Sequence, residues 1–385
     1  MSNQPAVMGP DGVTRPYIGG QALIEGVMMR SPHAFSAVVR RRDGSLVVRE
    51  RPMADLRQGA RAWPIVRGMM ALVEALKLGS QALRFSAEIY ERDLDLEAQE
   101  EEAAKAKAKS PSGTTLLSAL SLPIVHLMTA EPELGAPKPA EESKGRSLMG
   151  ILSIVFAIGM FVALPQAFAH GASSLFKLNL DIRAPLFQLL TAFGKLTILV
   201  GYMLLIRRLP EIYRVFQYHG AEHKSIYTYE SGAELTVDNA RSRTTLHPRC
   251  GTTFIVMVAL VSIAVFSCLG SFLPHTGLGK VGEGALFFVL KLPFLPLIAA
   301  ITFELQRVLA KYCSTGPLSL LLWPGFLVQK ITTIEPDDQQ LEVALSALLV
   351  TLRVEKGATV SQADASFPSY AALAQVPSPL QDALA

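Results

Sequence analysis

Long apolar runs alternate with polar stretches through the middle and C-terminal half of the chain. Four of them approach or exceed the length that a helix needs to cross a hydrocarbon layer of about 30 Å. Few charges interrupt these runs, and Arg207 and Arg208 mark a water interface where the second run ends. The pattern predicts a mainly α polytopic membrane protein with about four transmembrane helices, near 148–168, 185–206, 252–273 and 285–303. Pro293 and Pro296 predict a kink in the fourth.

Lysine and arginine are distributed unevenly between the connections of these predicted spans. The segment 207–249 contains seven, whereas the loops 170–184 and 274–284 contain two and one. Basic residues near the ends of spans resist translocation across a membrane. We therefore expect the loop 207–251 and both termini on the cytoplasmic side of a bacterial inner membrane.

The first ninety residues follow a different pattern. Two runs of alternating, β-branched-rich sequence flank Asp43-Gly44, a dipeptide typical of tight hairpin turns. Residues 63–90 then have an apolar stripe at helical spacing but too many charges for a span, which predicts a helix on the membrane surface or against the bundle. Residues 17–90 are thus predicted to form a small α+β cytoplasmic cap, which follows a disordered N-terminus, 1–16.

The remaining segments are assigned from their composition. An acidic run, an Ala/Lys run and a Pro/Ser-containing stretch predict a flexible linker over 91–146, before a membrane domain over 147–334. Within that domain, 317–334 is apolar but interrupted by Trp323-Pro324-Gly325, so we expect a re-entrant or interfacial segment. An amphipathic helix is predicted at 335–355 and a disordered tail at 356–385.

The composition agrees with a membrane protein whose partner is a lipid bilayer. Hydrophobic residues make up 50% of the chain and charged residues 18%, with a mean hydropathy of +0.32, which is too apolar for an ordinary soluble protein. The net charge of +3 suits basic residues beside anionic lipid better than a nucleic-acid groove, so no nucleic-acid partner is expected. The three cysteines are too few for a disulfide framework, and the first residues lack the apolar core of a signal peptide.

The most specific candidate for chemistry is His219-Gly220-Ala221-Glu222-His223, which follows the second predicted span. On a helix, both imidazoles would share one face and could reach one metal ion, with Glu222 close enough to act as a ligand or a base. The H-x-x-E-H spacing is that of the inverted zinc-protease motif. Alternatively, both histidines belong to an inward-facing stripe and are simply hydrogen-bonded in a core.

Two other segments supply ligand-type groups at the same predicted membrane depth. His247 and Cys250 lie directly before the third span, and imidazole and thiolate are both good zinc ligands. Glu304 lies at the inner end of the fourth span, where a carboxylate is a functional candidate. The alternatives are a capped turn for His247 and Cys250, and an ion pair with Arg249 or Arg307 for Glu304.

A glycine-rich segment near the N-terminus gives a further candidate, Glu25. Its paired glycines, Gly19 and Gly20, would let the backbone approach a ligand closely, but the pattern lacks a nucleotide-binding fingerprint. Glu25 is either a carboxylate of the site or the partner of Arg30. Inside the second span, Lys195 is expected to extend its side chain toward the outer interface.

These segments together resemble the YqhQ-like family, bacterial membrane proteins of unknown function described as predicted metal-dependent enzymes. The resemblance runs over roughly 17–353, except 91–146, through GGQALIEGVMMR, FQYHGAEHKSIYTYE, LHPRCGTTF, ITFELQR and WPGFLVQKITTIEPDDQQLEVA. It implies a metal at His219, Glu222 and His223, with His247 and Cys250 as further ligands. Beside these, Glu25, Arg249 and Glu304 are the additional candidates.

Three functions are compatible with this sequence. The first is a membrane enzyme that depends on a divalent metal, zinc, and is hydrolase-like, with Glu222 as its catalytic base and a cytoplasmic substrate or partner of unknown identity. The second is a non-enzymatic scaffold or assembly factor, in which the same ligands form a closed structural site. A transporter is less favoured, because only Lys195 and Lys291 interrupt the spans and no broken inverted repeat is evident.

Overall fold

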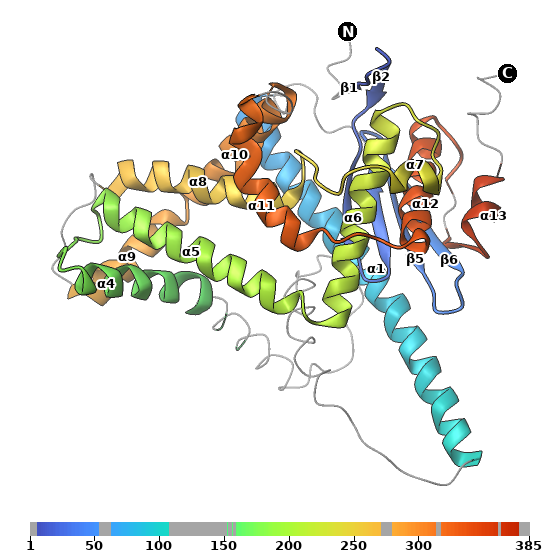
Figure 1. Cartoon of the computed structure of the whole chain (residues 1–385), viewed down its shortest axis with the longest axis horizontal. Helices are drawn as coiled ribbons and strands as arrows, with labels where there is room; N and C mark the ends of the chain where they lie inside the picture. Colours follow the sequence, from blue (N-terminus) through green and yellow to red (C-terminus); the bar gives the residue numbers. More distant parts are fainter. Residues whose placement is uncertain are drawn as a thin grey trace.

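The computed structural model contains a β-sheet part and an apolar helical part, which helices α1 and α6 connect (Figure 1). It describes residues 6–53, 63–107, 152, 156, 159–270, 279–312, 317–360 and 363–376. The mostly helical architecture with an N-terminal β region agrees with the predicted fold class.

The sheet is antiparallel throughout, in the order β3-β4-β5-β6-β7. The predicted hairpin around Asp43-Gly44 is confirmed, since it joins β5 to β6 and Gly44 adopts a φ of 86°. A separate hairpin at the N-terminus shows that the prediction of disorder is wrong for residues 6–16. The strands are β1 (Ala6–Met8), β2 (Thr14–Pro16), β3 (Gly19–Leu23), β4 (Gly26–Arg30), β5 (Ala34–Arg40), β6 (Leu46–Pro52) and β7 (Ala365–Phe367).

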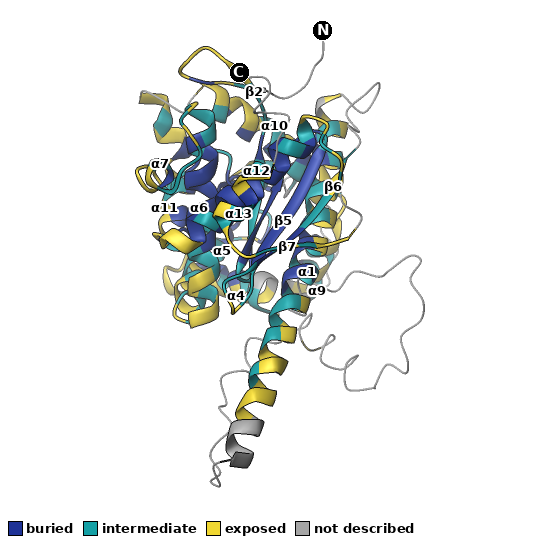
Figure 2. Ribbon diagram, turned by 90° about the vertical axis from the view of Figure 1, so that its right-hand side faces the viewer, coloured by how far each residue is buried: buried dark blue, intermediate teal, exposed yellow. Residues whose placement is uncertain are grey.

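Helices cover both faces of the sheet, because successive strand residues point to opposite sides. Val27 and Met29 pack in the core beneath α12 (Asp338–Glu355) and α6 (Pro210–Glu230), whereas Met28 packs on the other face against Phe85 of α1. The strands between these layers are buried (Figure 2).

Helix α12 is a central core element, which corrects the prediction of a merely amphipathic helix at 335–355. Asp337 and Gln340 form a reciprocal capping box that begins the helix. The helix is buried on nearly all sides, since α6, α7 (Val237–Arg241) and α13 (Tyr370–Ala374) pack on it besides the sheet. The predicted disordered tail is likewise wrong for residues 363–376, where β7 extends the sheet and α13 follows.

Helix α1 (Pro64–Lys107) runs well past residue 90, where the sequence predicted its end. Residues 91–107 are rich in Glu, Ala and Lys, which favour helix strongly, so the prediction of a linker is wrong there. Near its start, Gly68 packs closely against Ala300, and the C-terminal end projects away from the sheet (Figure 2). The rest of the predicted linker, 108–146, lies outside the described residues.

The helical part begins and ends close to several of the predicted span boundaries. Helix α5 has the predicted bounds, and the fourth predicted span is broken at Pro293 into α9 and α10. The elements are a π-helical turn (Gly159–Ala163), α4 (Leu164–Leu175), α5 (Pro185–Ile206), α8 (Gly251–Gly270), α9 (Gly279–Lys291), α10 (Phe294–Tyr312), a 3₁₀ turn (Pro317–Leu322) and α11 (Trp323–Thr332).

By length and composition, one described helix, α5, could cross a membrane. A second candidate results if Gly282–Lys291 and Phe294–Tyr312, bent by 51°, count as one span. Most of the first half of the predicted span 148–168 and the last residues of 252–273 lie outside the described residues. The count of four spans therefore stays a prediction.

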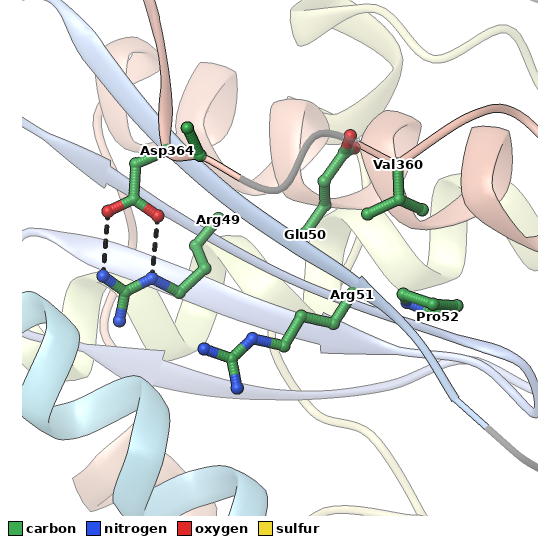
Figure 3. Close-up of a pocket in the computed structure, with 7 residues that line it drawn as sticks. Arg49, Glu50, Arg51, Pro52, Val360 and Asp364 are labelled. Atoms are coloured by element: carbon green, nitrogen blue, oxygen red, sulfur yellow. Dashed lines mark hydrogen bonds and ion pairs between the residues drawn. The ribbon is translucent and has the colours of Figure 1, made fainter.

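The β6–β7 edge of the sheet carries a hollow in which Arg49 and Asp364 form two hydrogen bonds of 2.8 Å (Figure 3). This ion pair fastens the segment before β7 to β6. Helix α6 packs on the opposite edge, at β3 and β4, so the hollow lies away from the histidine motif.

A candidate metal centre on helix α6

Helix α6 brings the two histidines of the H-x-x-E-H segment onto one face. The helix begins with Pro210 at a position where a missing N–H costs nothing, and His219 and His223 follow one turn apart with ring centroids 4.5 Å from each other. The loop after α6 returns Cys250 to the same place. The ligand atoms of His219, His223 and Cys250 all lie within 4.8 Å of one another, so three predicted ligands form one group.

Backbone carbonyls fix the orientation of both imidazoles. Nδ1 of His219 is 2.9 Å from the carbonyl oxygen of Thr332, and Nδ1 of His223 hydrogen-bonds to the carbonyl oxygen of Thr245. Because a carbonyl can only accept, each Nδ1 carries the hydrogen and each neutral ring keeps its lone pair on Nε2. This is the arrangement that holds histidine ligands in metal sites.

The surroundings of Cys250 favour the thiolate form of its side chain. Its Sγ lies 3.2 Å from Nε2 of His219 and accepts hydrogen bonds from the backbone N–H of Thr252, at 3.4 Å, and from its hydroxyl, at 3.1 Å. Burial alone would raise the pKa of Cys250, but the imidazoles of His219 and His223 lower it well below its ordinary value. A thiolate at this position suits a soft divalent cation.

The His219 ring balances that negative charge. Burial by itself lowers the pKa of His219, but the Cys250 thiolate beside it raises the net pKa to about 9. The pair thus shares a proton that a divalent cation would displace on binding. A tetrahedral zinc ion would set its nitrogen and sulfur ligands about 3.6 Å apart, close to the 3.2 Å between His219 Nε2 and Cys250 Sγ, so the donor set fits the ion.

Glu222 lies beside this group and is 5% exposed. Burial raises the pKa of its carboxyl group, and the nearby rings of His223 and His219 partly offset that rise. The backbone of β3 passes directly over it, because a Cβ atom on Gly20 would be 2.8 Å from Cγ and Oε1 of Glu222. Gly20 thus lets the strand pass close to a protein carboxylate, and the predicted approach to a ligand stays a prediction.

His247 is next to the group and outside it. Its ring centroid is 5.5 Å from that of His223, and its Nδ1 accepts a hydrogen bond of 3.3 Å from the backbone N–H of Arg249. Its Nε2 faces Glu230 at 3.6 Å and makes no hydrogen bond within the described part of the chain. Burial lowers the pKa of His247 to about 4, so this ring is neutral.

Glu25 is engaged elsewhere. Its carboxylate forms two hydrogen bonds with the guanidinium of Arg214 and accepts a third, of 3.2 Å, from the hydroxyl of Tyr218. The predicted partner, Arg30, instead pairs with Glu74 at 3.1 Å. Glu25, which has a φ of 51°, therefore forms a tie between the β3–β4 turn and α6.

Arg249 and Glu304 also have structural partners. Arg249 pairs with Glu230 and lies 4.8 Å from the centroid of the Tyr17 ring. Glu304 forms a bidentate pair with Arg67 of α1, at 2.6 and 3.0 Å. The predicted partners of Glu304, Arg249 and Arg307, were therefore wrong. The pair of Glu304 with Arg67 connects helices more than 200 residues apart in sequence, so the local sequence could not indicate it.

Two buried glutamines hold the backbone that carries the thiol, and sequence reasoning did not find them. Gln329 accepts a hydrogen bond of 2.8 Å from the N–H of His247 and donates one of 2.7 Å to its carbonyl oxygen. Gln306 donates to the carbonyl oxygen of Cys250 at 3.0 Å. Each is a single carboxamide next to a charged residue, Arg307 or Lys330, and no local pattern marks it.

Comparisons with known proteins place the chain among proteins of unknown function. The family model described as "Protein of unknown function (DUF1385)" matches residues 63–354. The "Uncharacterized protein YqhQ" of Bacillus subtilis (strain 168) is 31% identical over 345 residues, which cover 88% of this chain and 93% of that protein. No solved structure matches the chain.

Proposed function

We propose that this chain is an inner-membrane protein with a metal-dependent, hydrolase-like activity at its cytoplasmic interface. The chain belongs to the DUF1385 family, and this membership confirms the resemblance predicted from the sequence. The observation that carries the proposal is the grouping of His219, His223 and Cys250 beside the buried carboxyl group of Glu222. The metal is a divalent cation, zinc.

The exposure of apolar side chains supports insertion into a membrane. The apolar window of α5 has a mean hydropathy of 2.0, yet only 17% of it is buried within the protein. A core helix of a soluble protein would be mostly buried. Leu189, Phe193 and Leu205 of α5 are each more than half exposed, which is costly in water and favourable in lipid.

The arrangement of the two parts supports the proposed orientation. The sheet, both described ends of the chain and α6 lie on one side of the apolar helices (Figure 1). The Lys/Arg-rich segment 207–249 belongs to that side, as expected for a cytoplasmic location. An impermeant thiol reagent on intact cells should label Leu178→Cys above wild type and leave Glu234→Cys unlabelled until the cells are permeabilised. The reverse pattern would invert the orientation.

Three protein ligands are typical of catalytic zinc sites, in which a fourth position remains for water or substrate. Bound there, the cation supplies the Lewis acidity that makes a water nucleophilic near neutral pH. Glu222, whose carboxyl pKa is raised by burial, would serve as the general base beside these ligands. His219 and His223 are held for ligation by Thr332 and Thr245.

A closed structural site in a scaffold is the second candidate, and burial favours it. Glu222 and Cys250 are each 5% exposed and His223 is 1% exposed, which leaves little access for a substrate. In this arrangement Glu222, which lies beside the group of three, would be the fourth ligand, and a site with four protein ligands serves folding rather than catalysis.

Metal analysis of purified variants tests the proposal. Wild type should contain stoichiometric zinc, and His219→Ala, His223→Ala and Cys250→Ser should each lose most of it, since losing one of three ligands removes most of the affinity. His170→Ala, on α4, is the matched control and should retain the metal. Wild type without stoichiometric metal, and functional histidine variants, would refute both candidates.

Glu222→Gln separates the enzyme from the scaffold. If Glu222 is a base, the amide should keep the metal and the thermal stability but fail to complement a deletion strain. If Glu222 is a ligand in a closed site, the same variant should lose metal and stability together. Normal complementation with full metal content would exclude an essential role for this carboxylate.

A further inference from the structure

A second polar cluster lies inside the apolar helices, away from the histidines. Lys195 of α5 and Lys291 at the end of α9 line one small cavity with Gln188, Thr191 and Ser262. Lys195 is the eleventh residue of the 22-residue helix α5, so it lies about 15 Å from either helix end. Lys291 lies where α9 and α10 are bent by 51°. The sequence predicted that the side chain of Lys195 extends toward the outer interface, but Lys195 instead lines this cavity.

The surrounding groups orient the side chain of Lys291 into the cavity. The ammonium of Lys291 donates to Oε1 of Gln188 at 3.0 Å and lies 3.9 Å from the centroid of the Phe287 ring and 4.8 Å from that of Phe266. The hydroxyls beside them already donate to carbonyls of their own helices, Thr191 to Phe187 and Ser262 to Ala259. The two ammonium groups are therefore the strongest donors at the cavity.

No carboxylate of these helices can neutralise the two charges. The segments 147–180, 184–210, 251–282 and 284–303 contain neither Asp nor Glu. At their borders, Glu283 pairs with Arg183 at 3.2 Å and Glu304 with Arg67 at 2.6 Å. Burying two like charges inside an apolar bundle is costly, and contacts with aromatic rings offset only part of that cost. An anion between them would offset that cost.

We infer that the cavity between α5, α8 and α9 binds a small inorganic anion of chloride size, held by the ammonium groups of Lys195 and Lys291. The volume of about 20 Å³ leaves room for a monatomic ion and not for a polyatomic anion such as phosphate. The depth also disfavours a lipid headgroup, since the headgroup layer begins about 15 Å from the middle of the bilayer. The site is distinct from the metal cluster and does not depend on the function proposed for it.

Thermal unfolding of the purified protein in detergent tests this site. Titration with sodium chloride, at an ionic strength kept constant with sodium gluconate, should raise the unfolding midpoint of wild type by a few degrees and saturate. Lys195→Met and Lys291→Met should each abolish the rise. Lys311→Met, which removes a lysine at the end of α10, is the matched control and should retain it.

Three results would overturn the inference. The first is a midpoint that responds equally to chloride and gluconate, or equally in wild type and both cavity variants. The second is stabilisation by added phosphatidylglycerol, and not by chloride, that both variants lose, which would assign the lysines to a headgroup. The third is a midpoint that rises with pH and does not respond to chloride, which would make one lysine a neutral proton carrier.

If the variants fail to fold, chloride-35 NMR of wild type tests the site. Broadening of the chloride line by the protein that added bromide reverses supports the site, and the absence of such broadening refutes it.

Discussion

Gly220 separates the two candidate ligands of α6, and a single methyl group there should disrupt the site without altering a ligand. A Cβ atom at this position would lie 2.1 Å from the carbonyl oxygen of Ile334. The backbone of Ile334 is also fixed by a hydrogen bond from its N–H to the carbonyl oxygen of Phe216. Relief to 3.0 Å requires a shift of at least 0.9 Å. The neighbour is backbone, so no side-chain rotation can provide this shift. The carbonyl of Thr332, two residues earlier, orients His219 and would move with it.

The size of the effect follows from two opposing terms. Gly→Ala within a helix gains up to about 1 kcal/mol in helix propensity. Overpacking against a fixed backbone typically costs about 1–3 kcal/mol, and this contact is severe, so we expect net destabilisation by about 1–2 kcal/mol. Gly201→Ala is the matched control, because nothing lies within 4 Å of the added methyl group on α5, and it should be neutral or slightly stabilising.

The assay compares thermal unfolding and zinc content of the two variants in one detergent. Gly220→Ala should unfold a few degrees below wild type and lose zinc, whereas Gly201→Ala should do neither. A Gly220→Ala protein as stable as the control and fully metallated would show that the Ile334 segment does not fix the site.

Three further changes test other parts of the structure. Gly20→Ala should displace the carboxylate of Glu222, so zinc content should stay near wild type while complementation fails; intact complementation would contradict a base role. Ser36→Ala should lower the free energy of unfolding by about 1–3 kcal/mol in denaturant titrations, because its buried hydroxyl is within 2.8 Å of the Thr351 hydroxyl and of a helix carbonyl. His247 has a pKa of about 4 when folded and about 6.5 when unfolded, so the unfolded state binds more protons between these values and stability should fall by about 3 kcal/mol as pH drops from 6.5 to 4. His247→Gln should flatten that decline, and an unchanged acid limb would contradict the assignment.

Elements whose determining signal is local could be predicted from the sequence, and the others could not. Helix α5 was bounded correctly because Pro185 and the Arg207–Arg208 pair stand at the two ends of one apolar run. The β5–β6 hairpin was found for the same reason, through its Asp-Gly turn. Strand β7 has only three residues and pairs with a strand more than 300 residues away, so no local pattern could show it.

The same distinction applies to the candidate site. Helical spacing within α6 correctly placed His219 and His223 together, and the predicted ligand Cys250 joins them. The partners of Glu25 and Glu304 were missed, because each ion pair joins helices or strands that only the tertiary fold brings together. The sequence shows that a charged residue in an apolar segment needs a partner, but it does not identify that partner.

The group of His219, His223 and Cys250 lies between the two parts of the molecule. The two histidines belong to α6, which packs on the sheet, but the backbone of Cys250 is held by Gln306 of α10 and that of His247 by Gln329 of α11. The thiol is therefore positioned by the apolar helices, whereas both imidazoles project from the sheet-bound helix and that of His219 is also oriented by Thr332 of α11. Any displacement of α10 and α11 relative to the sheet would separate Cys250 from His219, so the geometry of the ligands depends on how the two parts are held together.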